Sequence, residues 1–389
     1  MGKYDFDEIV SRRGTDCVKW DHDNMPEDVL PLWVADMDFR VAPAITEALR
    51  HRVEHGVFGY VQVPEEYYNS VIDWYGRRHD FAIRREWIQY TSGVVPAVSV
   101  CVQAFTQPGD KVLILTPVYN CFYSSIANAR CEMVESRLRY DNHRYTIDFD
   151  DFEAKAADPA VKLFVMCNPH NPACRVWTRK ELMRVGEICL RHNVLVVSDE
   201  IHCEFVYGHN RYTPFGSLSP EMLANSVTCC SPSKTFNTAG LQMANIICAD
   251  AARREKIDRV INVNEVCDVN PFGYLAVMAA YDESEPWLLE LLDYIEGNYK
   301  ALKSFFAERL PHLGVTELEG TYLAWIDVRS LGKNSETLCE ELMQKARVML
   351  NAGTLYGAAG EGFLRINMAC PRSILMEALR RIAPYLGIK

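Results

Sequence analysis

Residues 226–237 read SVTCCSPSKTFN, an apolar run that leads through small residues to Lys234. The run Ser226–Cys230 is short, apolar and bounded by turn formers, which predicts a strand covered on both faces. The small residues after it predict a turn that presents one amine directly beyond the strand. A lysine after a strand is usually a solvated surface residue, so the chemical meaning of Lys234 depends on its neighbours.

Four further apolar runs end in polar residues in the same way, namely Ile88–Thr91, Val112–Leu115, Val161–Met166 and Val194–Ser198. Strand-like runs alternate with helical stretches from about residue 88 to 250, which is typical of a mostly parallel sheet with helices on both faces. Ligands of open α/β sheets bind beyond the carboxyl ends of the strands. The residues that follow these runs are therefore expected at one site.

That site combines five chemical groups. Lys234 brings an amine, Tyr119 an aromatic ring, Asn171 an amide, and Asp199 a carboxylate, with His202 three residues further on. The turn Ser92-Gly93-Val94-Val95 could open a helix whose free N–H groups hold a phosphate. Together the five groups predict a pocket for pyridoxal 5'-phosphate. Each residue also has an ordinary interpretation: a helix N-cap for Asp199, a core aromatic for Tyr119, a turn residue for Asn171 and a structural histidine for His202.

Four motifs carry a family resemblance over nearly the whole chain. The motifs TSG at 91–93, NP at 171–172, DEIH at 199–202 and SPSK at 231–234 resemble the class I/II aminotransferase superfamily of fold type I. Within it, WVADMDF at 33–39, DEIH and SKTFN at 233–237 resemble the MalY/PatB-type cystathionine β-lyases, also called cysteine C–S lyases. WVADMDF is the most specific motif, since many transaminases share the lysine and aspartate motifs.

The resemblance implies an α/β fold of type I. A large domain with a mostly parallel, seven-stranded sheet and helices on both faces is expected over residues 45–285, and a small α+β domain over 286–389. Residues 1–44 are expected to pack with the small domain. There the pattern predicts a long helix from Leu288 to about Leu310, a strand over Gly320–Asp327, and helices near Glu336–Lys345 and Ser373–Tyr385.

The resemblance also implies roles. Lys234 would form the imine bond with the cofactor and then act as the base at the substrate Cα. Asp199 would keep the pyridine nitrogen protonated, and the ring of Tyr119 would stack on the cofactor. Asn171 and His202 would face the phenolate oxygen. Phosphate would be held by the N–H groups of the Gly93, Val94 and Val95 turn, the hydroxyls of Ser231 and Ser233, and Tyr60 of a neighbouring subunit.

For the substrate, the resemblance implies an α-carboxylate clamp by Arg365, whose guanidinium fork suits a carboxylate. Ala35 and Tyr60 are also implied in substrate binding. Two residues depart from the wider superfamily pattern. Gln242 stands where common transaminases carry an arginine, which makes the phosphate cup less cationic. Cys174 stands where glycine is usual, at a cost of about 1 kcal/mol or more if that position needs a positive φ.

Three functions remain open from the residues. The first is β-elimination from cystathionine or another L-cysteine S-conjugate, which gives a thiol, pyruvate and ammonia. The second is transamination of aromatic or other neutral amino acids, which needs the same pocket. The third is a regulatory role in which a homodimer binds another protein. The resemblance favours the first.

Composition indicates a soluble enzyme. The net charge of −11, from 41 basic and 52 acidic residues, argues against nucleic acid or an anionic membrane surface as a partner. No long apolar run or signal peptide is recognisable, so a cytoplasmic protein is expected. The 14 cysteines contain no Cys-x-x-Cys pair, which favours buried thiols over disulfides, and no metal site is expected.

Overall fold

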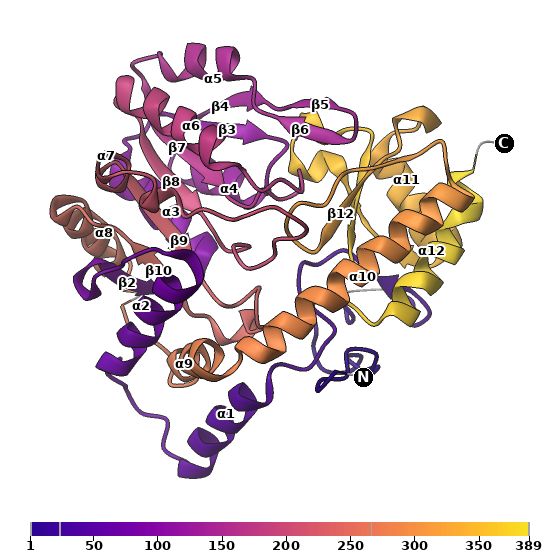
Figure 1. The fold of residues 1–389 in the computed structure, drawn as a ribbon, viewed down its shortest axis with the longest axis horizontal. Coiled ribbons are helices and arrows are strands. Elements are labelled where there is room, and N and C mark those ends of the chain that lie inside the picture. The colour runs from indigo at the N-terminus through magenta and orange to yellow at the C-terminus, as the bar shows by residue number, and fades with distance from the viewer. Residues whose placement is uncertain (1, 23–24, 266, 388–389) are drawn as a thin grey trace.

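The computed structural model describes residues 2–22, 25–265 and 267–387. Its centre is a seven-stranded sheet in the order β2-β10-β9-β8-β7-β3-β4 (Figure 1). β3, β4, β7, β8 and β9 are parallel, whereas β10 is antiparallel to both β9 and β2. This sheet confirms the predicted α/β fold. The strands are β2 (Ile88–Thr91), β3 (Lys111–Thr116), β4 (Glu132–Arg137), β7 (Val161–Cys167), β8 (Leu195–Asp199), β9 (Ser226–Cys230) and β10 (Ala244–Ile247).

Helices cover both faces of the sheet, as its apolar strands require. α3 (Val94–Phe105), α4 (Cys121–Asn128) and α8 (Ala251–Val263) share one apolar cluster with Val112 and Ile114 of β3. α5 (Phe149–Ala156), α6 (Arg179–Arg191) and α7 (Pro220–Ala224) share the other with Leu113 and Leu115. Because successive side chains of a strand point to opposite faces, one strand contributes to two cores.

Three more helices lie beside the β2 edge of the sheet. α1 (Pro43–His55) and α2 (Glu65–His79) both contact α9 (Gly273–Glu283). α1 lies at the periphery of the molecule in Figure 1. The segment between α1 and α2 carries Tyr60.

A second, four-stranded sheet follows the long helix α10 (Glu285–Arg309), which crosses the molecule in Figure 1. Its antiparallel strands are β11 (Gly314–Val315), β12 (Leu323–Asp327), β15 (Phe363–Asn367) and β14 (Asn351–Ala352), in that order. α11 (Ser335–Glu341) and α12 (Arg372–Leu386) complete this part. The N-terminal segment joins it through β1 (Leu30–Pro31), which pairs in parallel with β13 (Val348–Met349).

A hairpin, the state of the cysteines and the character of the described helices complete the description. β5 (Arg139–Asp141) and β6 (Arg144–Thr146) form a hairpin. All 14 cysteines are free thiols, and most are buried. None of the described helices combines the length and apolar character that a membrane span requires.

The predicted element boundaries needed two corrections. The strand expected from Gly320 begins at Leu323, because Thr321 adopts a φ of 71°, which a strand does not accommodate. The helix expected from Glu336 to Lys345 is α-helical over Ser335–Glu341 and continues as a π-helical turn over Leu342–Ala346.

Candidate active site

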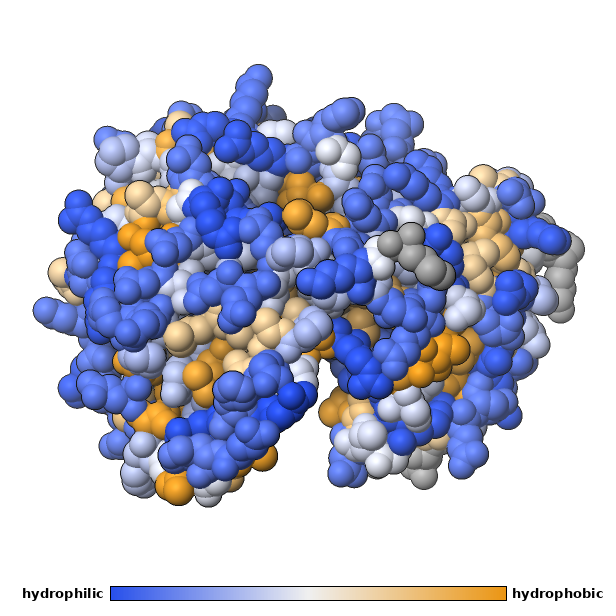
Figure 2. All heavy atoms as spheres, turned by 60° about the horizontal axis from the view of Figure 1, so that its bottom comes forward, coloured by the Kyte–Doolittle hydropathy of each residue, from blue (hydrophilic) through white to orange (hydrophobic). Residues whose placement is uncertain are grey.

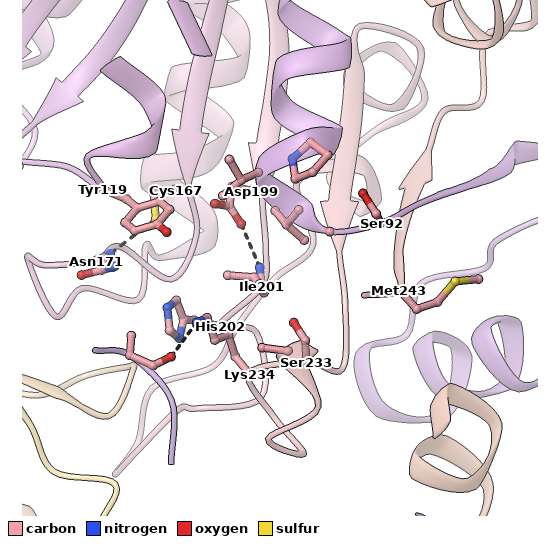
Figure 3. A pocket seen from close by; sticks show the side chains of 16 residues that line it. Ser92, Tyr119, Cys167, Asn171, Asp199, Ile201, His202, Ser233, Lys234 and Met243 are labelled. Carbon is pink, nitrogen blue, oxygen red and sulfur yellow. Dashed lines mark hydrogen bonds between the residues drawn. The ribbon is translucent and has the colours of Figure 1, made fainter. Parts of the chain in front are cut away.

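A cavity of about 210 Å³ opens where the predicted residues converge. Its walls come from the carboxyl ends of β7, β8 and β9, the start of α3 and the N-terminal segment (Figure 3). The lining residues are Ala35, Ser92, Gly93, Val94, Val95, Pro96, Tyr119, Cys167, Asn171, Asp199, Ile201, His202, Ser233, Lys234, Ala239 and Met243. The site thus lies beyond the carboxyl ends of the parallel strands, as expected for such a sheet.

Lys234 follows β9 by four residues and is half-buried at this cavity. Its Nζ donates a hydrogen bond of 2.5 Å to the backbone carbonyl of Ala35. The hydroxyl of Tyr322 donates to the same carbonyl at 2.9 Å. Burial lowers the pKa of the Lys234 amine, although the nearby carboxylates of Asp36 and Asp199 oppose that shift. A lower pKa makes more of the amine available as a nucleophile or a base.

Asp199 is the last residue of β8 and is almost completely buried. The backbone N–H of Ile201 donates to its Oδ1 at 3.1 Å (Figure 3). Burial raises the pKa of Asp199 to about 7; the charge of Glu200 adds to that shift, whereas Lys234 opposes it. A buried carboxylate of this kind is suited to pair with a basic ring nitrogen that carries a proton.

The start of α3 forms the wall of the cavity suited to an anion. Gly93 stands at its N-cap in an extended conformation, and no side chain caps the helix. The first N–H groups of a helix have no partners within it and attract negative charge. The predicted turn of Gly93, Val94 and Val95 is therefore at the cavity, with its donors uncapped.

The two predicted serines differ in position. Ser233 lines the cavity. The Oγ of Ser231 instead donates to the carbonyl of Met243 at 2.7 Å and accepts the N–H of Ser233 at 3.0 Å. Of the two hydroxyls, only that of Ser233 lies at the cavity. Gln242 is not a lining residue, and it adopts a φ of 50° after a short 3₁₀ turn.

Tyr119, Asn171 and His202 lie around the same space (Figure 3). The Nδ1 of His202 is buried and has no hydrogen-bond partner among the described residues. The pKa of His202 is lowered to about 3 by burial and by the charges of Lys234 and Arg365, so its imidazole is neutral. A buried nitrogen without a partner is costly in a finished core and indicates a missing ligand.

Arg365, on β15, reaches the site through Asn171. Its guanidinium donates to Oδ1 of Asn171 at 3.3 Å and to the carbonyl of Trp33 at 2.7 Å. The guanidinium carbon lies 4.8 Å from the centre of the Tyr356 ring. Its buried Nε has no partner in the part of the chain that the structure describes. The second sheet thereby places one fixed guanidinium next to the cavity.

Tyr60 is not brought to the cavity of its own chain. Its side chain is 97% exposed and does not line the site. Val57 and Phe58 nearby are also exposed, and the ring of Phe58 lies 5.5 Å from that of Phe272. Figure 2 shows hydrophobic residues on both sides of a notch at the lower edge of the molecule.

Cys174 adopts the left-handed conformation that its position suggested, with a φ of 59°. Its Sγ lies 3.3 Å from the carbonyl of Pro172 and 3.2 Å from that of Leu323. The thiol thus links the turn behind Asn171 to the second sheet. These contacts offset part of the backbone strain.

Sequence reasoning missed several residues at the site. Ile201 lies inside the DEIH motif, so its position was available from the sequence. Cys167, Ala239 and Met243 line the cavity without any sequence signal. Tyr322 was also missed, although its ring packs edge-on against His202, with centroids 5.6 Å apart.

One cluster of described residues has the atoms for a metal site, namely His79, Cys203 and Glu204. The Glu204 carboxylate already accepts hydrogen bonds from Trp74, Arg78 and His79. Those donors satisfy its charge, so we assign the cluster as an ion-pair network that fixes α2.

The sequence of this chain matches a known protein family and its members. The family model "Aminotransferase class I and II" matches residues 27–382. Cystathionine beta-lyase PatB of Bacillus subtilis strain 168 is 43% identical over 386 residues, with 98% of this chain and all of that protein covered.

Two solved structures share the fold. Cystalysin from Treponema denticola, which contains a pyridoxal 5'-phosphate cofactor, gives a TM-score of 0.96 at 36% identity over 98% of both chains. The PLP-bound C-S lyase from Staphylococcus hominis gives a TM-score of 0.92 at 31% identity, over 98% of this chain and 99% of that one.

Proposed function

Because this chain belongs to the aminotransferase class I and II family, we propose that it is a pyridoxal phosphate-dependent carbon–sulfur β-lyase. It cleaves cystathionine or related L-cysteine S-conjugates to a thiol, pyruvate and ammonia. The observation that carries this proposal is one buried cavity that holds the Lys234 amine, the Asp199 carboxylate and the uncapped start of α3. The relatives with lyase names support the lyase branch of the family.

The residues present fit the cofactor. Lys234 would hold its aldehyde carbon, Asp199 its ring nitrogen, and the start of α3 with Ser233 its phosphate. The Nδ1 of His202, which lacks a partner among the described residues, would face the phenolic oxygen together with the amide of Asn171. When bound, pyridoxal phosphate supplies a conjugated ring that takes up the electrons left behind when a proton leaves the substrate Cα.

Lys234 is the base at the substrate Cα. With the cofactor and the substrate bound, its Nζ would be placed to accept the Cα proton. The carbonyl of Ala35, which accepts from Nζ at 2.5 Å, provides a docking point for the freed amine. Burial lowers the pKa of this amine, which favours its neutral, basic form.

Asp199 keeps a proton at the ring nitrogen. A charge pair of this kind at 4 Å is worth roughly 4 kcal/mol at an effective dielectric of 20, before desolvation is subtracted. Because the Asp199 carboxylate is already buried, little further desolvation accompanies the pairing. Tyr119 provides the ring that stacks on the cofactor.

Arg365 selects an α-amino acid. Two of its nitrogens hold a side-chain amide and a backbone carbonyl, and its buried Nε has no partner among the described residues. A substrate carboxylate can replace the weak 3.3 Å contact to Asn171 with a charge-assisted pair. The carboxylate is thereby held while the thiolate leaves from Cβ.

The active unit is a homodimer in which Tyr60 of one subunit reaches the phosphate of the other. The almost complete exposure of Tyr60, next to exposed Val57 and Phe58, supports this arrangement, because soluble proteins seldom leave such groups in water. Apart from Lys234, no lysine or arginine lines the cavity among the described residues, so an added hydroxyl donor at the phosphate has a clear purpose.

The test is incubation of the purified protein with L-cystathionine, with and without a keto acid acceptor. Equal amounts of pyruvate and homocysteine without an acceptor are expected for the lyase. Turnover that depends on the acceptor would overturn the lyase assignment in favour of transamination.

A further inference from the structure

Glu200, directly after Asp199, is the most deeply buried acid next to the site, with no exposed surface. Five acidic residues among those described are buried, and three of them have cationic partners. Asp38 pairs with Lys19 and Arg12, Glu204 with Arg78 and His79, and Glu319 with Arg144 and Arg175. Asp199 and Glu200, consecutive in the chain, have no such ion pair in the described structure.

The Glu200 carboxylate is held by hydrogen-bond donors instead. The hydroxyl of Ser198 donates to Oε1 at 2.8 Å, and the backbone N–H of Phe215 donates to the same atom at 2.9 Å. The hydroxyl of Tyr212 donates to Oε2. Burial raises the pKa of Glu200, whereas these three donors oppose that shift. A backbone N–H can only donate, and three donors around two oxygens suit an ionised carboxylate.

The charge of Glu200 acts on Asp199 through space. Asp199 lines the cavity, whereas Glu200 points towards Tyr212 and Phe215, outside the cavity lining. Burial keeps this charge unscreened by solvent, and the charge of Glu200 contributes to the raised pKa of Asp199.

Besides Lys234 and the neutral imidazole of His202, the titratable groups around the pair are thiols and phenols. The pKa of each is raised, for Cys229 by a hydrogen bond with Cys101 and then by burial and for the others by burial, so they are neutral. These neutral groups are Tyr119, Tyr212, Cys167, Cys203, Cys229 and Cys230.

We propose that Glu200 is a positioning residue whose buried negative charge acts through Asp199 to keep the ring nitrogen of the cofactor protonated. This inference rests on the proposed function, in which Asp199 pairs with that nitrogen. Asp199 lines the cavity, and the Glu200 carboxylate lies outside its lining. The second charge therefore favours the proton at the nitrogen even though it does not touch the cofactor.

The experiment loads the protein with pyridoxal phosphate labelled with ¹⁵N in the ring and follows the nitrogen chemical shift against pH. Glu200→Gln keeps the size and an acceptor but removes the charge. We expect the pH at which the ring nitrogen loses its proton to fall by about one unit or more. Glu200→Asp, which keeps the charge, should restore a midpoint close to that of the parent protein.

Glu204→Gln is the matched control. It also removes a buried carboxylate from the same segment, but one whose charge is paired with Arg78 and which accepts a hydrogen bond from His79. It should lower the melting temperature without moving the midpoint of the ring nitrogen. A shift in this control as large as that in Glu200→Gln would overturn the proposal, because loosened packing would then explain both.

Asp199→Asn tests the role of Asp199 separately from the role of Glu200. A lowered midpoint in Asp199→Asn together with an unchanged one in Glu200→Gln would overturn the role of Glu200 and leave the proposed function standing. An unchanged midpoint in Asp199→Asn would instead remove the role of Asp199 on which both depend.

A measurement on the parent protein decides the matter if Glu200→Gln does not fold. Glutamate labelled with ¹³C at Cδ reports ionisation directly, and the Glu200 signal is the one absent from the Glu200→Asp spectrum. An ionised signal at neutral pH supports the proposal. A protonated signal overturns it, since a neutral acid exerts no such field.

Discussion

The amine of Lys234 lies 2.5 Å from the carbonyl oxygen of Ala35, a residue 199 positions earlier in the chain. The contact joins the turn after β9 to the WVADMDF segment, which is held in turn by the ion pairs of Asp38 with Lys19 and Arg12. The most specific motif of the sequence thus supplies a backbone acceptor for the reactive lysine. Its side chains mainly fix that acceptor in place.

Lys234→Ala should abolish the absorbance band at about 420 nm that a pyridoxal Schiff base gives. Among the described residues, no other lysine lines the cavity. The rate of cystathionine cleavage should fall by orders of magnitude. Lys162→Ala, at an exposed position of β7, is the control and should keep both. A band retained in Lys234→Ala would show that another lysine holds the cofactor.

Asp199→Ala should reduce kcat for elimination by about 10²-fold or more, which is the scale expected when an active site is deprived of a major electrostatic interaction. KM should change less, because Arg365 still binds the substrate carboxylate. Steady-state kinetics with L-cystathionine measure both values. Turnover close to that of the parent protein would contradict the role assigned to Asp199.

Tyr60→Phe should weaken cofactor retention without dissociating the dimer, because the ring stays and only the hydroxyl donor is removed. Equilibrium dialysis of the cofactor and analytical ultracentrifugation measure the two properties. Tyr385→Phe, whose hydroxyl donates to the carbonyl of Lys345 far from the cavity, is the control. Equal cofactor affinity in both variants would show that Tyr60 does not reach the phosphate.

Cys174→Gly should be more stable than Cys174→Ala by about 1 kcal/mol, because glycine adopts a positive φ without strain and alanine does not. Both variants lack the thiol and its interactions, so their difference isolates the backbone. Urea unfolding of the two variants gives this difference in the free energy of unfolding. Equal stabilities would show that the turn relaxes when the thiol is removed.

The cofactor-free protein should lose stability as the pH falls from about 6.5 towards 4. Burial lowers the pKa of His170 to about 4 and that of His202 to about 3, against about 6.5 in an unfolded chain. Below pH 6.5 the unfolded state therefore binds protons that the folded state excludes, which favours unfolding. The loss from His170 is on the order of 3 kcal/mol once the pH is below 4.

His202→Asn should reduce the loss of stability at acid pH. Urea unfolding at several pH values measures this loss as the free energy of unfolding. Asp199 acts with the opposite sign, since its pKa is raised to about 7 and its contribution to stability falls as the pH rises from about 4 to 7. Asp199→Asn should accordingly steepen the net loss on the acid side. An equal loss of stability at acid pH in His202→Asn and the parent protein would contradict the lowered pKa of His202.

Some of this protein was determined by the sequence alone. β9 spans Ser226–Cys230, as the apolar run between turn formers predicted. Glu285-Pro286-Trp287 was predicted to open the long helix, and α10 begins at Glu285, one residue before a proline that suits the first turn of a helix. Several of the predicted residues, such as Tyr119, Asp199 and Lys234, also line one cavity, because each lies at or beyond the end of a buried strand and such strand ends meet at one edge of a parallel sheet.

Tertiary structure alone decided the rest. The antiparallel direction of β10, the turn of the Ser231 hydroxyl towards Met243, and the exposure of Tyr60 carry no local signal. The same holds for the charge balance around Asp199, since only the fold shows that Glu200 is surrounded by donors while Glu204 meets cations. Local pattern decides which residues form strands and turns, because it depends on neighbours in the chain. Where a side chain points and which charge it meets depend on segments far away in the sequence, which only packing brings together.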